Sequence, residues 1–300
     1  MKLNQLRDFL AVAERRSIRA AARQLNLPQP NITRSIHELE RELGVVLFER
    51  RAQGVDLTPM GEVFLRRARS VRRELERAQE ELDQLRGETH GHLTVCMSSV
   101  PYIALFPEAL PAFRKRYPLV KLALFDGVFP RVETSVKDGT IDCYIGPPPE
   151  IVPPDMLVEK LFDNTLVVMG RKGHPLAHAR SLRELTGAEW MTTSITRKAE
   201  EELAPLFEQH GLPTPQLAVQ AQSAMSCMIT LAHSDLLIAA PVQWLGSGMC
   251  DALQIIPVVE IITAPPICIV RRAGLPLTPA ADYFCDMMRR ASLHMEAAAA

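Results

Sequence analysis

The sequence has no run of apolar residues long enough to cross a membrane, which takes about 20 residues. Its opening, MKLNQLRDFLAVAERR, places Asp8 inside an apolar stretch. This pattern indicates an amphipathic helix and not a secretion signal. We therefore expect a cytoplasmic protein that has no membrane partner.

Signatures of catalysis and metal binding are missing as well. The chain contains no G-x-S-x-G, H-E-x-x-H or G-x-x-x-x-G-K-[ST] motif. His90 and His92 lie close together, but a solvated hinge explains them better than a metal pair. We expect no enzyme activity, no catalytic residue, no metal site and no cofactor.

The six cysteines show no C-x-x-C spacing, and most of them lie in apolar segments. This pattern predicts buried thiols in a reducing compartment. A redox switch built on one of them is the alternative.

Charge is unevenly distributed along a chain whose net charge is only −1. Residues 1–73 carry a net charge of +7, and the remaining residues carry −8. Contacts with nucleic-acid phosphates require positive charge, so the N-terminal quarter is the candidate nucleic-acid-binding part. The length of 300 residues predicts two or three domains, and a hydrophobic content of 47% is ample for their cores.

Residues 17–43, SIRAAARQLNLPQPNITRSIHELEREL, predict two helices joined by a very short turn. Ser17 is a good N-cap for the first helix, at about residues 18–25. Asn26 and Leu27 interrupt that helix, and Pro28 suits the first turn of the second. Helix-turn-helix DNA-binding units have this close spacing.

The second helix has two different faces. An apolar stripe at helical spacing consists of Ile32, Ile36, Leu39 and Leu43. The other face offers side chains that match base edges, since arginine matches guanine, glutamine matches adenine, and threonine can use its hydroxyl or its methyl group. A solvated amphipathic helix is the alternative. The candidate DNA-binding residues are Gln29, Pro30, Thr33, Arg34 and His37. Of these, Gln29, Thr33 and Arg34 are expected to contact bases.

Two short apolar runs on either side of a basic tip follow this helix, within residues 44–58. Together with Gly54 at the tip, they predict a small β-hairpin, or wing. Arg50 and Arg51 are placed to contact phosphates there.

The stretch SIRAAARQLNLPQPNITRSIHELERELGVVLFERRAQGVDLTPMGE resembles the N-terminal domain of LysR-type transcriptional regulators. The resemblance extends over essentially the whole chain, by motif in the N-terminal part and by length and domain order beyond it. Two positions depart from the family pattern. Ile18 replaces the usual aromatic residue, and Asn31-Ile32-Thr33 stands where Ala-aliphatic-Ser is usual. Both changes keep size and polarity, so they leave the fold intact and the preferred DNA sequence open.

A long helix is predicted to begin at Thr58 and Pro59 and to continue without proline to Arg86. Apolar residues follow a 4-3 repeat along it, which favours a coiled coil with a second chain. Packing on its own domain is the alternative. The candidate dimerisation residues are Phe64, Ala68, Val71, Leu75, Ala78, Leu82 and Leu85. A dimer would hold two recognition helices one DNA turn apart, or a multiple of it, over a symmetric site.

Strand-like and helical segments alternate after Gly87 and Gly91, which predicts an α/β fold with a mostly parallel sheet. Residues 161–169 are expected to form one strand. The family resemblance implies two Rossmann-like α/β subdomains of the periplasmic-binding-protein type, with the last strand and helix returning to the first subdomain. The expected domains are a winged helix-turn-helix domain at 1–58, a linker and dimerisation helix with a hinge at 59–90, and an effector-binding domain at 91–300. Its subdomain I spans about 91–162 and 267–300, and its subdomain II about 163–266.

Open α/β sheets bind ligands beyond the carboxyl ends of their strands. Three segments at such positions carry hydroxyl groups at helix starts, which favour a carboxylate or sulfonate. Plain helix capping is the alternative for each segment. The candidate effector-binding residues are Ser98, Ser99, Val100, Pro101, Val128, Phe129, Thr192, Thr193, Ser194 and Ser223. Arg197 and Lys198 are placed to add positive charge, and Ile195 to add to the apolar wall.

The first hypothesis is a LysR-type transcriptional regulator without enzyme activity. As a homodimer or a homotetramer, it would bind an interrupted palindrome in double-stranded DNA, with RNA polymerase as a further partner. A small, anionic organic acid bound between the α/β subdomains would control it. The alternative is a cytosolic small-molecule-binding or enzymatic α/β protein with a helical dimerisation head. The charge division and the polar helix face favour the regulator, because an enzyme needs neither.

Overall fold

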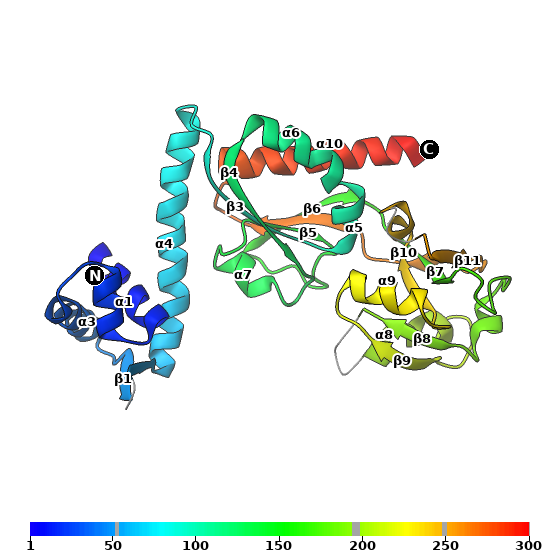
Figure 1. The fold of residues 1–300 in the computed structure, drawn as a ribbon, viewed down its shortest axis with the longest axis horizontal. Coiled ribbons are helices and arrows are strands. Elements are labelled where there is room, and N and C mark those ends of the chain that lie inside the picture. The colour runs from blue at the N-terminus through cyan, green and yellow to red at the C-terminus, as the bar shows by residue number, and fades with distance from the viewer. Residues whose placement is uncertain (52–53, 194–198, 248–250, 300) are drawn as a thin grey trace. The chain divides into compact units, whose positions relative to one another are not determined.

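The structure is a computed structural model that describes residues 1–51, 54–193, 199–247 and 251–299. The chain divides into two compact units (Figure 1). The first consists of Met1–Glu88 with Thr134–Ile141, and the second of Thr89–Glu133 with Asp142–Ala300. In the described part of the chain, no helix has both the length and the apolar content of a membrane span.

The first unit begins with three helices, α1 (Leu3–Arg15), α2 (Ile18–Gln24) and α3 (Gln29–Leu43). Ser17 caps α2 as predicted, since its hydroxyl oxygen accepts a hydrogen bond from the Ala20 amide at 3.2 Å. Asn26, with φ of 53°, adopts the left-handed conformation between α2 and α3. Fully buried side chains from all three helices, including Phe9, Ala21 and Ile32, form the core. The predicted helix-turn-helix arrangement is therefore confirmed.

The wing and a long helix complete this unit. Strands β1 (Phe48–Arg51) and β2 (Gly54–Leu57) pair in antiparallel fashion, which confirms the predicted hairpin. Helix α4 (Pro59–Leu85) begins where it was predicted, and the Thr58 hydroxyl oxygen accepts a hydrogen bond from the Gly61 amide at 3.0 Å. Leu43 differs from the prediction, because it is 38% exposed at the last position of α3. The apolar stripe of α3 therefore ends at Leu39.

The second unit contains a sheet with the strand order β4-β3-β5-β13-β6. Its strands are β3 (His90–Met97), β4 (Leu119–Asp126), β5 (Cys143–Gly146), β6 (Met156–Phe162) and β13 (Ile267–Arg272). Strand β3 runs parallel to β4 and β5, whereas β13 runs antiparallel to β5 and β6. The sheet is therefore mostly parallel, with one reversed strand.

Helices α5 (Ser99–Ala104), α6 (Phe106–Arg116) and α10 (Pro279–Ala299) accompany this sheet, whereas α7 (Glu133–Lys137) lies in the first unit except for Glu133. Helices α6 and α10 lie side by side along it (Figure 1). The rings of Phe113 and Phe284 join them edge to face, with 5.4 Å between the centroids. The last strand and helix thus return to the first subdomain, as the family resemblance implied.

A second group of strands forms the other subdomain. Strand β7 (Thr165–Arg171) lies between β10 (Ile238–Pro241) and β11 (Leu253–Ile256), also pairs with β12 (Ile262–Thr263), and is antiparallel to all three. Strand β8 (Glu189–Thr192) runs parallel to β9 (Gln216–Gln220), and a single bridge joins Trp190 to Leu237 just before β10. The helical segments here are η1 (Leu182–Leu185), α8 (Ala199–Glu208), α9 (Ala224–Ala232) and η2 (Val242–Ser247).

The two subdomains have the same arrangement. In each sheet, the strand that runs opposite to its neighbours is the first strand after the chain crosses from the other subdomain. Strand β7 follows β6, and β13 follows β12, so the chain crosses between the subdomains at residues 163–164 and 264–266. The crossings lie side by side, because Phe162 pairs with Ile267 and Thr165 pairs with Thr263. The prediction of one continuous strand over residues 161–169 is therefore wrong, since the break at Asp163 and Asn164 separates β6 from β7.

Five cysteines are buried and form no disulfide, as the sequence predicted. They are Cys96, Cys143, Cys227, Cys268 and Cys285. The sixth, Cys250, lies outside the described residues.

Candidate DNA-binding and effector-binding sites

Helix α3 is fixed by one face and offers the other to solvent. Ile32 and Ile36 are buried in the core of the first unit. The predicted DNA-binding residues Gln29, Pro30, Arg34 and His37 are exposed, and Thr33 is partly exposed. The structure thus brings all five side chains of the predicted set onto one accessible helix face.

Two of these residues have partners that limit what they can offer a ligand. The Thr33 hydroxyl donates to the Gln29 carbonyl at 3.2 Å, so its proton is used within the helix and its oxygen can still accept a hydrogen bond. His37 Nδ1 lies 3.5 Å from Glu40 Oε2. The Glu40 carboxylate also accepts hydrogen bonds from the amides of Leu47 and Phe48, at 2.8 and 3.2 Å. Glu40 therefore connects the candidate recognition helix to the first strand of the wing.

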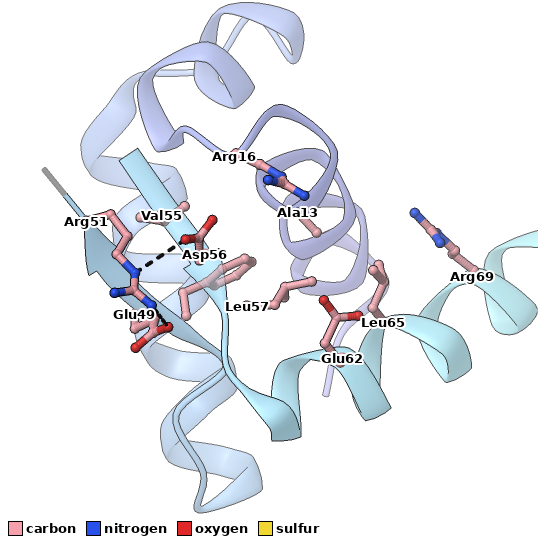
Figure 2. Close-up of a pocket in the computed structure, with 11 residues that line it drawn as sticks. Ala13, Arg16, Glu49, Arg51, Val55, Asp56, Leu57, Glu62, Leu65 and Arg69 are labelled. Atoms are coloured by element: carbon pink, nitrogen blue, oxygen red, sulfur yellow. Dashed lines mark hydrogen bonds and ion pairs between the residues drawn. The ribbon is translucent and has the colours of Figure 1, made fainter. Parts of the chain in front are cut away.

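Arg51 takes part in ion pairs within the wing (Figure 2). Its guanidinium lies 2.6 Å from Glu49 Oε1 and 3.3 Å from Asp56 Oδ2. Glu49 and Asp56 are direct partners in the strand register, so two like charges would otherwise face each other. Arg51 thus has a structural role besides the predicted contact with phosphate. The side chain of Arg50 lies outside the described residues.

A pocket of about 550 Å³ lies where α1, the wing and α4 meet (Figure 2). Its basic lining residues are Arg16, Arg51 and Arg69, and its acidic lining residues are Glu49, Asp56 and Glu62. The charges balance, so this pocket does not have the positive potential that a phosphate site requires.

The structure divides the predicted dimerisation residues of α4 into two groups. Phe64 and Ala68 pack inside their own domain, in contrast to the prediction. The Phe64 ring lies 4.8 Å from that of Phe9, and Ala68 is only 1% exposed, because the first turns of α4 lie against α1. The other five residues are exposed, and we call them the α4 stripe: Val71, Leu75, Ala78, Leu82 and Leu85.

Four of the predicted effector residues lie at the junction of β3 and α5. Ser98 occupies the N-cap position but makes no capping bond, so the helix-capping alternative does not hold for it. Ser98 is only 5% exposed, and its hydroxyl oxygen has no hydrogen-bond partner among the described residues. Ser99 is partly exposed, whereas Val100 and Pro101 are buried. A buried hydroxyl without a hydrogen-bond partner costs free energy. A ligand that bonds to Ser98 would remove this cost, so Ser98 is a candidate ligand contact.

The candidate apolar wall lies just after β4, and titratable groups of β3, β4 and α5 lie near this end of the sheet. Val128 is 47% exposed, and the Phe129 ring packs edge to face on Tyr144, with 5.0 Å between the centroids. Burial, with a smaller contribution from Asp126, raises the pKa of Cys96 to about 12 and that of Tyr102 to about 12. Partial burial likewise raises the pKa of Asp126.

Subdomain II supplies the remaining candidates. Thr192 is buried at the end of β8 and Thr193 is exposed, whereas Ser194, Ile195, Arg197 and Lys198 lie outside the described residues. Ser223 caps α9, since its hydroxyl oxygen accepts a hydrogen bond from the Ser226 amide at 3.1 Å, as the capping alternative predicted.

One polar contact between the subdomains involves a residue that sequence reasoning missed. The indole Nε1 of Trp244, in η2, donates a hydrogen bond to the Ser99 hydroxyl at 3.0 Å. No sequence pattern could have revealed it, because the two residues are 145 positions apart.

Comparison with known families and proteins agrees with this architecture. Residues 3–62 match the bacterial regulatory helix-turn-helix protein, lysR family, and residues 86–292 match the LysR substrate binding domain. The regulator TfdS of Cupriavidus pinatubonensis is 32% identical over 259 residues, which cover 83% of this chain and 81% of TfdS. The regulator GbpR of Azospirillum brasilense is 26% identical over 300 residues, which cover 97% of this chain and 87% of GbpR.

Solved structures show the same fold. The LysR family transcriptional regulator CbnR is 23% identical, with a TM-score of 0.68 over 97% of this chain and 99% of CbnR. Full-length CbnR in complex with its target DNA gives a TM-score of 0.69 at the same identity, over 97% of this chain and 100% of that one.

The helix-turn-helix unit with its wing and the two α/β subdomains define a DNA-binding transcriptional regulator with a substrate-binding domain. The chain belongs to the LysR family of transcriptional regulators.

Proposed function

We propose that this regulator binds an interrupted palindrome in double-stranded DNA as a homodimer or a homotetramer, and that a small organic acid bound between its α/β subdomains controls it. Gln29, Thr33 and Arg34 contact bases in this proposal. Arg50 and Arg51 contact phosphates, with RNA polymerase as a further partner. The protein acts in the cytoplasm as a regulator and not as an enzyme.

The observation that carries the proposal is the exposed face of α3. Its base-matching side chains project from a helix whose other face is fixed by Ile32 and Ile36 in the core. Such a helix can enter the major groove without losing its own support. The net charge of +7 over residues 1–73 adds the attraction to phosphates.

The α4 stripe supports self-association. Its leucines, Leu75, Leu82 and Leu85, are 48%, 53% and 70% exposed, a large apolar area for one helix to leave in water. A second copy of the same helix would cover the stripe in the manner of a coiled coil. Dimerisation would raise DNA affinity, because the second recognition helix then binds at a high effective concentration.

The junction of β3 and α5 supports a ligand site. Ser98 offers a buried hydroxyl without a partner among the described residues, and Val128 offers apolar area beside Phe129. With Ser99, Val100, Pro101, Thr192, Thr193, Ser194 and Ser223, these are the residues that we propose contact the effector. The effector shifts the regulator between arrangements only through a difference in affinity for them.

The test is a gel shift with the DNA immediately upstream of the protein's own gene, over a salt series, with and without small aromatic and aliphatic acids. Arg34→Ala is expected to cost roughly 1–3 kcal/mol on the specific site and to relax base preference there. Arg72→Ala is the matched control, because Arg72 is an exposed arginine of α4 that pairs with Glu76. An equal loss on random DNA would contradict the base-contacting role of Arg34, and failure to bind any DNA would refute the proposed function.

A further inference from the structure

Helix α5 is shared between the cores of the two subdomains. Val100 of α5 and Leu105, the residue that ends this helix, are buried in the core of subdomain I. Ile103, on the same helix, packs against the subdomain II core that contains Trp244, Met228 and other residues. A change in the position of α5 would therefore alter the side-chain packing in both subdomains.

The hydrogen bond between Trp244 and Ser99 adds a polar link to this apolar one. Trp244 is 1% exposed, so its indole N–H is removed from water and donates to the Ser99 hydroxyl instead. Ser99 itself is partly exposed, so a small molecule can still reach it. Ser99 follows Ser98 in the chain, and both residues belong to the proposed effector site.

The chemistry of the two groups fixes the direction of this bond. An indole N–H can only donate, so the Ser99 oxygen accepts and its own proton remains available for another acceptor. Consecutive hydrogen bonds polarise one another, so the bond from Trp244 to Ser99 strengthens a bond from the Ser99 hydroxyl to a ligand.

We propose that Trp244 is a positioning residue of the effector site, which holds Ser99 as a hydrogen-bond donor and couples its ligand to η2 of subdomain II. In this proposal, the ligand accepts a hydrogen bond from Ser99 through an oxygen atom of a carboxylate or a carbonyl group. This inference rests on the proposed function, because it assumes that a small molecule binds between the subdomains.

The link itself can be tested in the full-length protein without any ligand. The chain contains two tryptophans, and Trp190 is fully buried with its ring edge to face on Phe207. The variant Trp190→Phe therefore makes Trp244 the sole indole fluorophore. In this background, Ser99→Ala is expected to shift the Trp244 emission maximum and to increase its quenching by acrylamide. Ser99→Thr keeps the hydroxyl and should preserve both signals.

Ser98→Ala is the matched control, because it removes the hydroxyl of the preceding residue, which is not hydrogen-bonded to Trp244. Emission and quenching that stay the same in Ser99→Ala would overturn the proposal. Should Trp190→Phe fail to fold, fluorine NMR of protein labelled with 5-fluorotryptophan gives the same information, with the Trp244 signal assigned through Trp244→Phe.

The donor role of Ser99 is tested with sodium acetate, sodium succinate and sodium benzoate as carboxylate probes, and benzyl alcohol as an uncharged probe. A carboxylate that changes operator binding should also change the Trp244 emission. Its apparent affinity should fall by about 5- to 10-fold in Trp244→Phe, as expected for one hydrogen bond, and remain unchanged in Trp190→Phe. Equal affinity in Trp244→Phe would overturn the proposal. If no carboxylate changes operator binding, the proposal of an acid effector is contradicted. The fluorescence of Ser99→Ala without ligand then still tests the hydrogen bond between Trp244 and Ser99.

Discussion

The backbone carbonyl of Arg16 accepts a hydrogen bond from the amide of Val55, with 3.0 Å between oxygen and nitrogen. Arg16 is the left-handed C-cap of α1, and Val55 lies in the second strand of the wing. Gly54 precedes Val55 with φ of 145°, and a Cβ at this position would lie 2.4 Å from the same carbonyl oxygen. The wing is thus docked on the end of α1 by a contact that only glycine permits at position 54.

Gly54→Ala is therefore expected to detach or distort the wing. The free energy of unfolding should fall by roughly 2–3 kcal/mol, because the new Cβ meets backbone atoms that cannot move aside. Urea unfolding of the full-length protein measures this loss. Gly44→Ala is the matched control, since Gly44 also has a positive φ, of 70°, but its Cβ would meet nothing within 4 Å. That control should lose only about 1 kcal/mol, from backbone strain alone. Equal losses in the two variants would show that the Arg16 contact is unimportant.

Arg51→Ala separates the two roles of this arginine. Removal of the guanidinium leaves Glu49 opposite Asp56, so the unfolding free energy should fall, although by less than about 1 kcal/mol for such exposed groups. Adding Glu49→Gln should restore most of that loss. If Arg51 also contacts phosphate, the slope of log K against log salt concentration should decrease by about 1. A variant that keeps both its stability and its salt slope would contradict both roles.

Phe64 and Leu75 should behave differently, although both follow the same repeat in α4. Phe64→Ala is expected to lower the free energy of unfolding by about 2–3 kcal/mol, because the ring packs on Phe9. Leu75→Glu should leave the fold intact and weaken self-association by about ten-fold or more, since Leu75 is 48% exposed. Sedimentation equilibrium and urea unfolding distinguish the two effects. A Leu75→Glu variant that associates like the natural protein would contradict the role of the α4 stripe.

The buried cysteines should resist alkylation at neutral and mildly basic pH. Burial raises the pKa of Cys96 to about 12 and that of Cys227 to about 11, so both remain thiols at pH 8, and the reactive thiolate forms only as the pH approaches those values. Mass spectrometry after iodoacetamide treatment at pH 8 should find the five described cysteines unmodified in the folded protein and all six modified in urea. Rapid modification of Cys96 in the folded protein would favour the redox alternative.

Local signals in the sequence were sufficient to predict the DNA-binding unit. The cap at Ser17, the interruption at Asn26 and the start at Pro59 act within a few residues, so their effects do not depend on the rest of the chain. The 4-3 repeat of α4 was less informative. It has the same form whether a residue faces its own domain, as Phe64 does, or solvent, as Leu75 does.

Contacts between distant segments could not be predicted from such signals. Trp244 and Ser99 meet only because η2 and α5 pack together, and Glu40 finds its amide partners beyond the end of its helix. The missed break within residues 161–169 is different, because the polar pair Asp163-Asn164 is typical of turns and marks in the sequence itself where β6 ends and β7 begins.

The two neighbouring crossings between the α/β subdomains have a mechanical consequence. A single linker lets a domain swing in any direction, whereas two strands that pair on both sides of the junction resist shear and twist and bend easily along one path. Pro265 and Pro266 stiffen one of the two further, because their rings fix φ. We therefore expect the two subdomains to move relative to each other mainly by bending about these crossings, so that ligands of different chemistry would change the same angle.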